Sequence, residues 1–129
     1  MKKIIFTTLV GATFALANNN ATTITATMNL MSDGMTKIQK GFLLNQKNLI
    51  LDGINVVENA DAIFNTVDVS TFIPNNNKTQ VTKNINHNLS KSIKMLKEDV
   101  KAGKYADATT AYGKVLSNCI SCHTIIRGW

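Results

Sequence analysis

Apolar residues recur along most of this chain at intervals of three and four, the spacing of one face of an α-helix. The first stripe follows a polar stretch rich in threonine and asparagine, and Asp52-Gly53 is expected to end it. Its members are Met28, Met31, Met35, Ile38, Phe42 and Leu49. The pattern predicts a first helix that begins near Met28 and stops before Gly53.

Three further stripes follow. The second covers residues 56–64 and leads into a segment with Pro74 and three asparagines, which predicts a loop. The third covers residues 81–100, with Gly103 as its expected C-terminal cap. The fourth runs from Tyr105 to Ile126. No segment alternates with period two for long enough to predict a sheet, so we expect an all-α, antiparallel four-helix bundle.

The first 17 residues have the layout of a secretory signal peptide. Lys2 and Lys3 precede an uncharged apolar run, and Ala15-Leu16-Ala17 has the small-x-small pattern cut by signal peptidase. The run is shorter than the roughly 20 apolar residues that span a bilayer. We therefore expect cleavage after Ala17, export to the periplasm, and a single domain over residues 18–129 with no membrane span.

The distribution of charge argues against nucleic acid as a partner. The chain has 14 basic and 8 acidic residues, a formal net charge of +6, and these charges are scattered along it. Nucleic-acid-binding domains concentrate such charge on one face or helix. We therefore expect no nucleic-acid interface.

The candidate chemistry lies in the last turns of the fourth stripe. Cys119 and Cys122 are the only cysteines, and His123 follows directly. A structural zinc site usually needs four ligands, and the only other histidine, His87, falls off its stripe and is expected to be exposed. A thioredoxin-like pair would begin a helix after a strand. A disulfide between residues three apart would be strained and would leave His123 without a role.

Covalent haem attachment accounts for the whole C-x-x-C-H motif, with disulfide or metal binding as the remaining alternatives. Two thiols one helical turn apart can both add to the vinyl groups of one haem, and the adjoining histidine can bind its iron. Only residues 124–129 follow His123, so a sixth iron ligand must come from upstream. In an antiparallel bundle the end of the last helix lies beside the start of the first, where Met28, Met31 and Met35 cluster.

A C-terminal C-x-x-C-H motif on an exported four-helix bundle resembles class II cytochrome c, the cytochrome c-prime type. The resemblance implies haem c held by Cys119, Cys122 and His123, with Arg127 at the spacing of the arginine that can pair with a haem propionate. Ile126 stands where the family usually has tyrosine. The family's distal position carries either no ligand or a methionine, and its members often form homodimers. On the family pattern Met35 ranks first as ligand, Met31 second and Met28 third.

Two functions follow from these expectations. The first is a periplasmic electron carrier that exchanges electrons with redox partner proteins, its iron bound by His123 and a first-helix methionine. The second is a high-spin, five-coordinate haem protein that binds nitric oxide or carbon monoxide. We do not expect an enzyme, because the first helix offers no histidine as a general acid or base near the iron.

Overall fold

The computed structural model of the protein describes residues 19–73 and 78–127, so the predicted signal peptide, residues 1–17, lies outside the described part. The helices are α1 (Asn19–Leu43), α2 (Lys47–Phe64), α3 (Thr79–Lys101) and α4 (Tyr105–Arg127), with a 3₁₀ turn, η1 (Val69–Thr71), after α2. The described residues include no β-strand. This confirms the all-helical, four-helix architecture. None of the helices described combines the length and apolarity that crossing a membrane requires.

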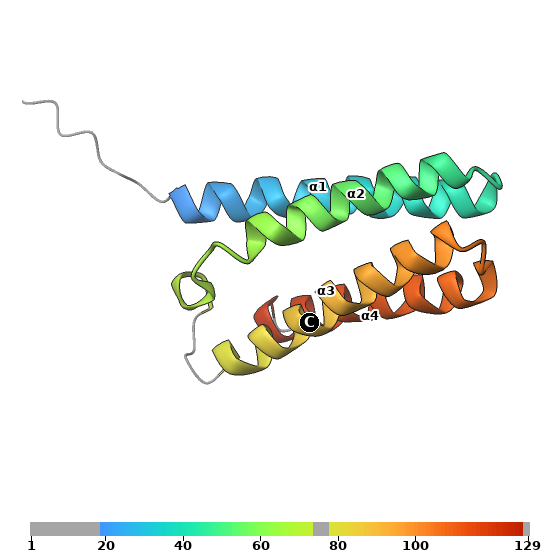
Figure 1. Ribbon diagram of the computed structural model, residues 1–129. Helices are drawn as coiled ribbons and strands as arrows, with labels where there is room; N and C mark the ends of the chain where they lie inside the picture. Colours follow the sequence, from blue (N-terminus) through green and yellow to red (C-terminus); the bar gives the residue numbers. More distant parts are fainter. Residues whose placement is uncertain (1–18, 74–77, 128–129) are drawn as a thin grey trace, which may run out of the picture.

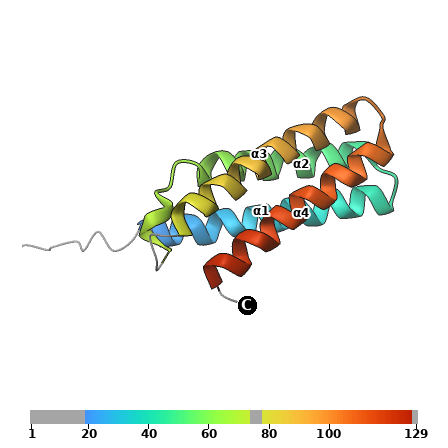
Figure 2. The same cartoon turned by 90° about the horizontal axis from the view of Figure 1, so that it is seen from below.

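The helices form two antiparallel hairpins, α1/α2 and α3/α4, stacked as two layers (Figure 1). Viewed from below, α4 crosses over α1 at an angle (Figure 2). We call the end that carries the α1–α2 and α3–α4 turns the turn end. The opposite end, where α1 begins and α4 finishes, is called the cleft end.

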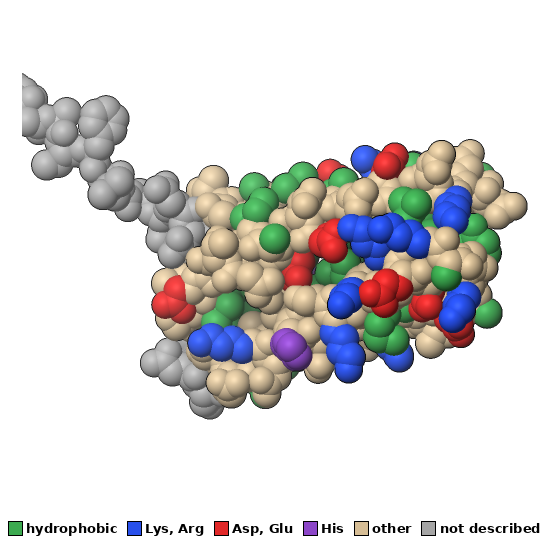
Figure 3. All heavy atoms as spheres, viewed as in Figure 1, with side chains coloured by type: hydrophobic (Ala, Val, Ile, Leu, Met, Phe, Trp, Pro, Cys, Tyr) green, Lys and Arg blue, Asp and Glu red, His purple; other side chains and the backbone are tan. Residues whose placement is uncertain are grey.

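Polar contacts join the hairpins towards the turn end. Lys97 of α3 forms an ion pair with Glu58 of α2. Lys47 Nζ, at the start of α2, donates to the carbonyl oxygen of Lys101 at 3.0 Å. In the space-filling view, basic and acidic side chains are mixed along the groove between the hairpins (Figure 3). These contacts tie the two layers together at the edge formed by α2 and α3.

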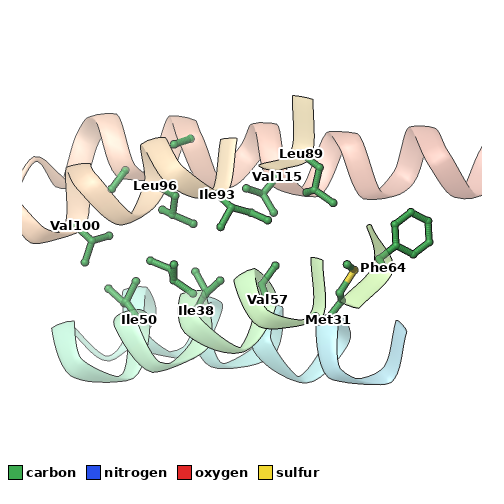
Figure 4. Close-up of a cluster of buried hydrophobic side chains, with 14 of the residues drawn as sticks. Met31, Ile38, Ile50, Val57, Phe64, Leu89, Ile93, Leu96, Val100 and Val115 are labelled. Carbon is green, nitrogen blue, oxygen red and sulfur yellow. The ribbon is translucent and has the colours of Figure 1, made fainter. Parts of the chain in front are cut away.

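The apolar core lies between the two layers. Figure 4 shows Ile38, Ile50 and Val57 of the first hairpin pointing towards Ile93 and Leu96 of the second. Each of these side chains is 1–2% exposed. Full burial of such a side chain stabilises the fold by about 1.5–3 kcal/mol relative to leaving it in water. The helical stripes therefore form because each supplies one wall of a common core.

The boundary between the first two helices corrects the sequence prediction. Asn45 has a φ of 52°, and the Gln46 N–H donates to the Gly41 carbonyl at 2.8 Å. The Asn45 N–H donates to Phe42 O at 3.3 Å, which completes a Schellman motif with asparagine in the left-handed position. Helix α1 therefore ends at Leu43, and it already includes the threonine-rich stretch before Met28. The predicted start near Met28 and break at Asp52-Gly53 were both wrong.

Gly53 lies inside α2 and is buried. A Cβ added there would lie 2.7 Å from the Gly34 carbonyl oxygen and 2.8 Å from the Ile38 nitrogen, both on α1. Only a residue without a side chain allows the two helices to approach so closely. The glycine that was expected to break a helix instead sets the spacing within the first hairpin.

The end of α3 matches its prediction. Gly103 has a φ of 73° and its N–H donates to Val100 O at 3.2 Å, while the Lys104 N–H donates to Asp99 O at 2.9 Å. These are the two bonds of a Schellman motif with glycine in the left-handed position. The chain then turns directly into α4, which carries the cysteines.

Candidate functional site

An apolar cleft of about 270 Å³ lies between the hairpins at the cleft end. Its walls come from α1, α3 and α4, three segments far apart in the sequence. The lining residues are Met28, Met31, Ser32, Met35, Ile85, Asn86, Leu89, Leu116, Asn118, Cys119, Ile120, Cys122 and His123. The structure thus brings the complete C-x-x-C-H motif and all three first-helix methionines to one site.

Helix α4 places the two cysteines on one face. Residues three apart on a helix are neighbours on its surface, and both thiols are half-buried against the cleft. His123 also lines the cleft and is half-buried. The α3/α4 hairpin is held at this end by Lys78, whose Nζ donates to the Ile125 carbonyl at 3.0 Å. The opening therefore lies between the hairpins, while the second hairpin itself stays joined.

Burial makes both thiols weaker acids than a cysteine thiol in water. It raises the pKa of the Cys119 thiol to about 11, with smaller contributions from the neighbouring Cys122 and from the Asp61 carboxylate. Burial also raises the pKa of Cys122. Catalytic redox cysteines have a lowered pKa, which supplies the reactive thiolate. The environment of Cys119 and Cys122 thus differs from that of a thioredoxin-like pair.

The register of α1 against α4 distinguishes among the methionines. The rings of Phe42 and Tyr112 pack with centroids 5.8 Å apart and connect these two antiparallel helices. His123 lies 11 residues after Tyr112, and Met31 lies 11 residues before Phe42. Met31 is therefore at the level of His123, and it is 7% exposed. Met35 lies one turn closer to the turn end and also lines the cleft.

The other residues singled out from the sequence lie elsewhere. The backbone of Arg127 ends α4, and its side chain lies outside the described part of the structure. His87 is exposed, as predicted, and lies at a separate polar depression with Lys83 and Ser90. It is therefore not part of the apolar cleft that contains the cysteines.

A buried polar cluster beside the cleft was not predicted from the sequence. The Asp61 carboxyl of α2 accepts a hydrogen bond from Ser90 Oγ at 2.5 Å. The Asn86 side chain, which lines the cleft, donates to Asn65 Oδ1 at 2.7 Å. One sequence signal was available, because Asp61 lies four residues after the core residue Val57 and thus on the apolar face of α2.

Comparison with known proteins does not add a relative. The chain matches no known protein family, no curated protein sequence and no solved structure. Within residues 19–73 and 78–127, no three His, Cys, Asp or Glu side chains gather as a group that could hold a metal ion.

Proposed function

We propose that residues 18–129 form a periplasmic monohaem c-type cytochrome that carries electrons. Cys119 and Cys122 would attach haem c covalently, and His123 and Met31 would bind its iron. The observation that carries this proposal is the position of the C-x-x-C-H motif and the three methionines on the walls of one apolar cleft. When bound, haem c supplies reversible one-electron chemistry at iron.

The residues of α4 fit covalent attachment. Cys119 and Cys122 are one turn apart, with an axial rise of about 4.5 Å, so both thiols can meet one edge of the same ring. Both are free thiols on the cleft wall. His123 is next in sequence to Cys122, so the covalent bonds would hold its imidazole close to the iron. Attachment at two points also prevents loss of the group when the protein unfolds.

The apolar walls fit a macrocycle. Ile85 and Leu89 of α3 and Met31 of α1 give the cleft apolar walls that would limit water beside a bound haem, and solvent exposure is one factor that sets the reduction potential of haem. Pockets for drug-sized ligands occupy about 300–1,000 Å³, so the 270 Å³ cleft is small for a haem. We expect the hairpins to separate further at the cleft end when haem is bound, and one ring edge to stay exposed.

The thioether of Met31 is the preferred second axial ligand. Its level along α1 matches that of His123, and it is more buried than Met28 or Met35. A thioether is neutral whether the iron is ferric or ferrous, and His/Met ligation raises the reduction potential of a haem. The level of Met31 along α1 and its burial support ranking it above Met35, which comes first on the family pattern.

An optical spectrum of the haem-loaded protein tests the proposal. We expect a low-spin spectrum in both oxidation states that carbon monoxide does not change. Met31→Leu should convert it to a high-spin spectrum that responds to carbon monoxide, whereas Met28→Leu, a matched change on the same wall, should leave it low-spin.

Each other outcome has a definite meaning. A wild-type protein that is already high-spin and binds carbon monoxide would make gas binding the function and leave the methionines as packing. Conversion by Met35→Leu in place of Met31→Leu would restore the order expected from the family. Purified protein without covalent haem would refute the proposal.

A further inference from the structure

The buried Asp61 has an incomplete set of hydrogen bonds. The residue is 6% exposed, and its Oδ2 accepts from Ser90 Oγ at 2.5 Å. Its other oxygen, Oδ1, is buried without a hydrogen-bond partner. A buried carboxylate normally needs a counter-charge or several donors. The Ser90 hydroxyl and a smaller contribution from the Asn65 side chain stabilise the charged form, but burial outweighs them and favours the protonated form of Asp61.

The groups around Asp61 can form hydrogen bonds with either its charged or its protonated carboxyl, without any movement of their heavy atoms. When Asp61 is charged, the Ser90 hydroxyl donates to Oδ2. When Oδ2 carries a proton, it can donate to Ser90 Oγ, and the serine proton then turns to the Asn86 carbonyl oxygen, 3.2 Å away. The Ser90 proton therefore has an acceptor in both states. This arrangement favours a group that changes its charge in the folded protein.

The same residues connect Asp61 to solvent and to the cleft. Ser90 lines the polar depression on the α2/α3 side, which provides a route for a proton from water. Asn86 lines both this depression and the apolar cleft. Asp61 also lies close enough to Cys119 for its charge to contribute to the raised pKa of that thiol. Asp61 is thus within electrostatic reach of the cleft wall at Cys119.

We propose that Asp61 is the redox-linked proton acceptor of this cytochrome, taking up a proton when an electron enters the cleft. The inference rests on the proposed function. With haem bound, one electron from a periplasmic reductant would reduce ferric to ferrous iron, and one proton from solvent would form an O–H bond on the Asp61 carboxylate. Reduction removes one positive charge from the site, so a nearby carboxylate loses stabilisation and binds a proton more tightly.

The surroundings of Asp61 support this assignment. Burial raises the pKa of Asp61, hydrogen bonding from the Ser90 and Asn65 side chains opposes that rise, and the charge of Glu58 adds a smaller increase. Glu58 is itself paired with Lys97. Lys83 and His87 on α3 and Asp68 before η1 line the polar depression that Ser90 borders, and Cys119 on α4 is within electrostatic reach of Asp61. The ionisable groups in the described part of α1, Asp33, Lys37 and Lys40, are exposed.

The test is the reduction potential of the haem-loaded protein as a function of pH. We expect the potential to fall as the pH rises, by up to about 59 mV per pH unit, the slope of one proton per electron. Asp61→Asn, which keeps the shape and removes the titration, should flatten this slope. Asp52→Asn, the same change at an exposed site on α2, should leave it as in the wild type.

Two further measurements keep the test independent of any one variant. Ser90→Ala removes the hydrogen bond that favours the charged form, so the sloping region should move to higher pH. The infrared difference between oxidised and reduced wild-type protein should show a protonated carboxyl that appears on reduction and is absent in Asp61→Asn.

A haem-loaded protein whose potential does not depend on pH would overturn the inference and leave the proposed function intact. A slope that persists in Asp61→Asn would overturn it as well, by assigning the proton to another group such as a haem propionate. A protein without covalent haem would overturn the inference and the proposed function together.

Discussion

The two ends of the bundle differ in the side chains that lie between the hairpins. At the turn end Ile50 and Val100 are at most 1% exposed, and the Phe42–Tyr112 pair joins α1 to α4. At the cleft end the facing side chains leave an apolar opening, bordered by half-buried cysteines and methionines. The turn end thus contributes aliphatic side chains that are almost fully buried in the protein alone, whereas the cleft end has sulfur-containing and apolar side chains along an opening.

The largest expected effect comes from a variant that changes the cysteines of the cleft end and leaves the turn end unaltered. Replacing both Cys119 and Cys122 by serine should abolish covalent haem attachment, because no thiol remains to form a thioether bond. The helical content should persist, since no core residue of the turn end is altered. Haem that co-migrates with the polypeptide on a denaturing gel measures the attachment, and circular dichroism measures the helices.

Ser121→Ala is the matched control for this variant, because Ser121 lies between the two cysteines on the same turn. It should retain covalent haem. Haem that stays bound to the double serine variant after denaturation would contradict the assignment of the cysteines.

A second comparison uses two leucines on α3 that are seven residues apart. Leu96 is 1% exposed in the core, whereas Leu89 lines the cleft. Leu96→Ala should cost about 2–5 kcal/mol of unfolding free energy, because it creates an enclosed cavity. Leu89→Ala should cost less in the protein without haem, since it only enlarges an existing opening. Urea unfolding of both variants in the background with both cysteines changed to serine measures the difference.

The haem-loaded protein sharpens this comparison. If haem fills the cleft, Leu89 gains packing partners, and the costs of the two substitutions should converge. Equal costs already in the haem-free background would contradict the contrast between the two ends.

The sequence predicted the helical stripes of α3 and α4 and the cap at Gly103, because periodicity and a left-handed glycine are local signals. The α1–α2 boundary was wrong because Gly53 has two possible roles, as a helix breaker or as a site of close helix contact. Only the position of Gly34 on the neighbouring helix decides between them. The actual turn uses Asn45, a weaker signal than glycine for a left-handed residue.

For the candidate site, as for the fold, the sequence predicted the local patterns and not the packing between helices. The C-x-x-C-H motif and the methionine cluster are sequence patterns, and antiparallel topology predicts that they meet. The proposed preference for Met31 over Met35 could not come from the sequence, since it depends on the register set by the Phe42–Tyr112 contact. The buried cluster around Asp61 depends on how α2 packs against α3, which no local pattern specifies.

A third prediction tests the close packing within the first hairpin. Gly53→Ala would place a Cβ within 3.0 Å of the backbone of α1, so the helices must separate, at a cost of about 1–3 kcal/mol. Gly113→Ala on α4 meets nothing within 4 Å and should stabilise the protein by about 1 kcal/mol through helix propensity. Thermal unfolding of both variants measures whether each substitution lowers or raises the stability. A stabilising Gly53→Ala would contradict the close approach of α1 and α2.

The smallest expected effect concerns single protons on Asp61 and Asp68. Burial raises the pKa of Asp61 above its unfolded value of 3.8, so the folded protein binds this proton more tightly than the unfolded chain. Its contribution to stability is fully present below pH 3.8 and is lost as the pH rises through the folded pKa. The stability difference between wild type and Asp61→Asn should therefore fall across that window.

Asp68 should behave in the opposite way. Its carboxylate accepts a hydrogen bond from the Ser70 backbone N–H at 2.9 Å, and this bond lowers its pKa below 3.8. Its contribution is present above pH 3.8 and is lost as the pH falls through the lowered value. The difference between wild type and Asp68→Asn should thus rise with pH while that for Asp61→Asn falls. The measurement is urea unfolding across the acid pH range. If both stability differences changed with pH in the same direction, Asp61 would carry no desolvated charge, and its link to the cleft would lose its physical basis.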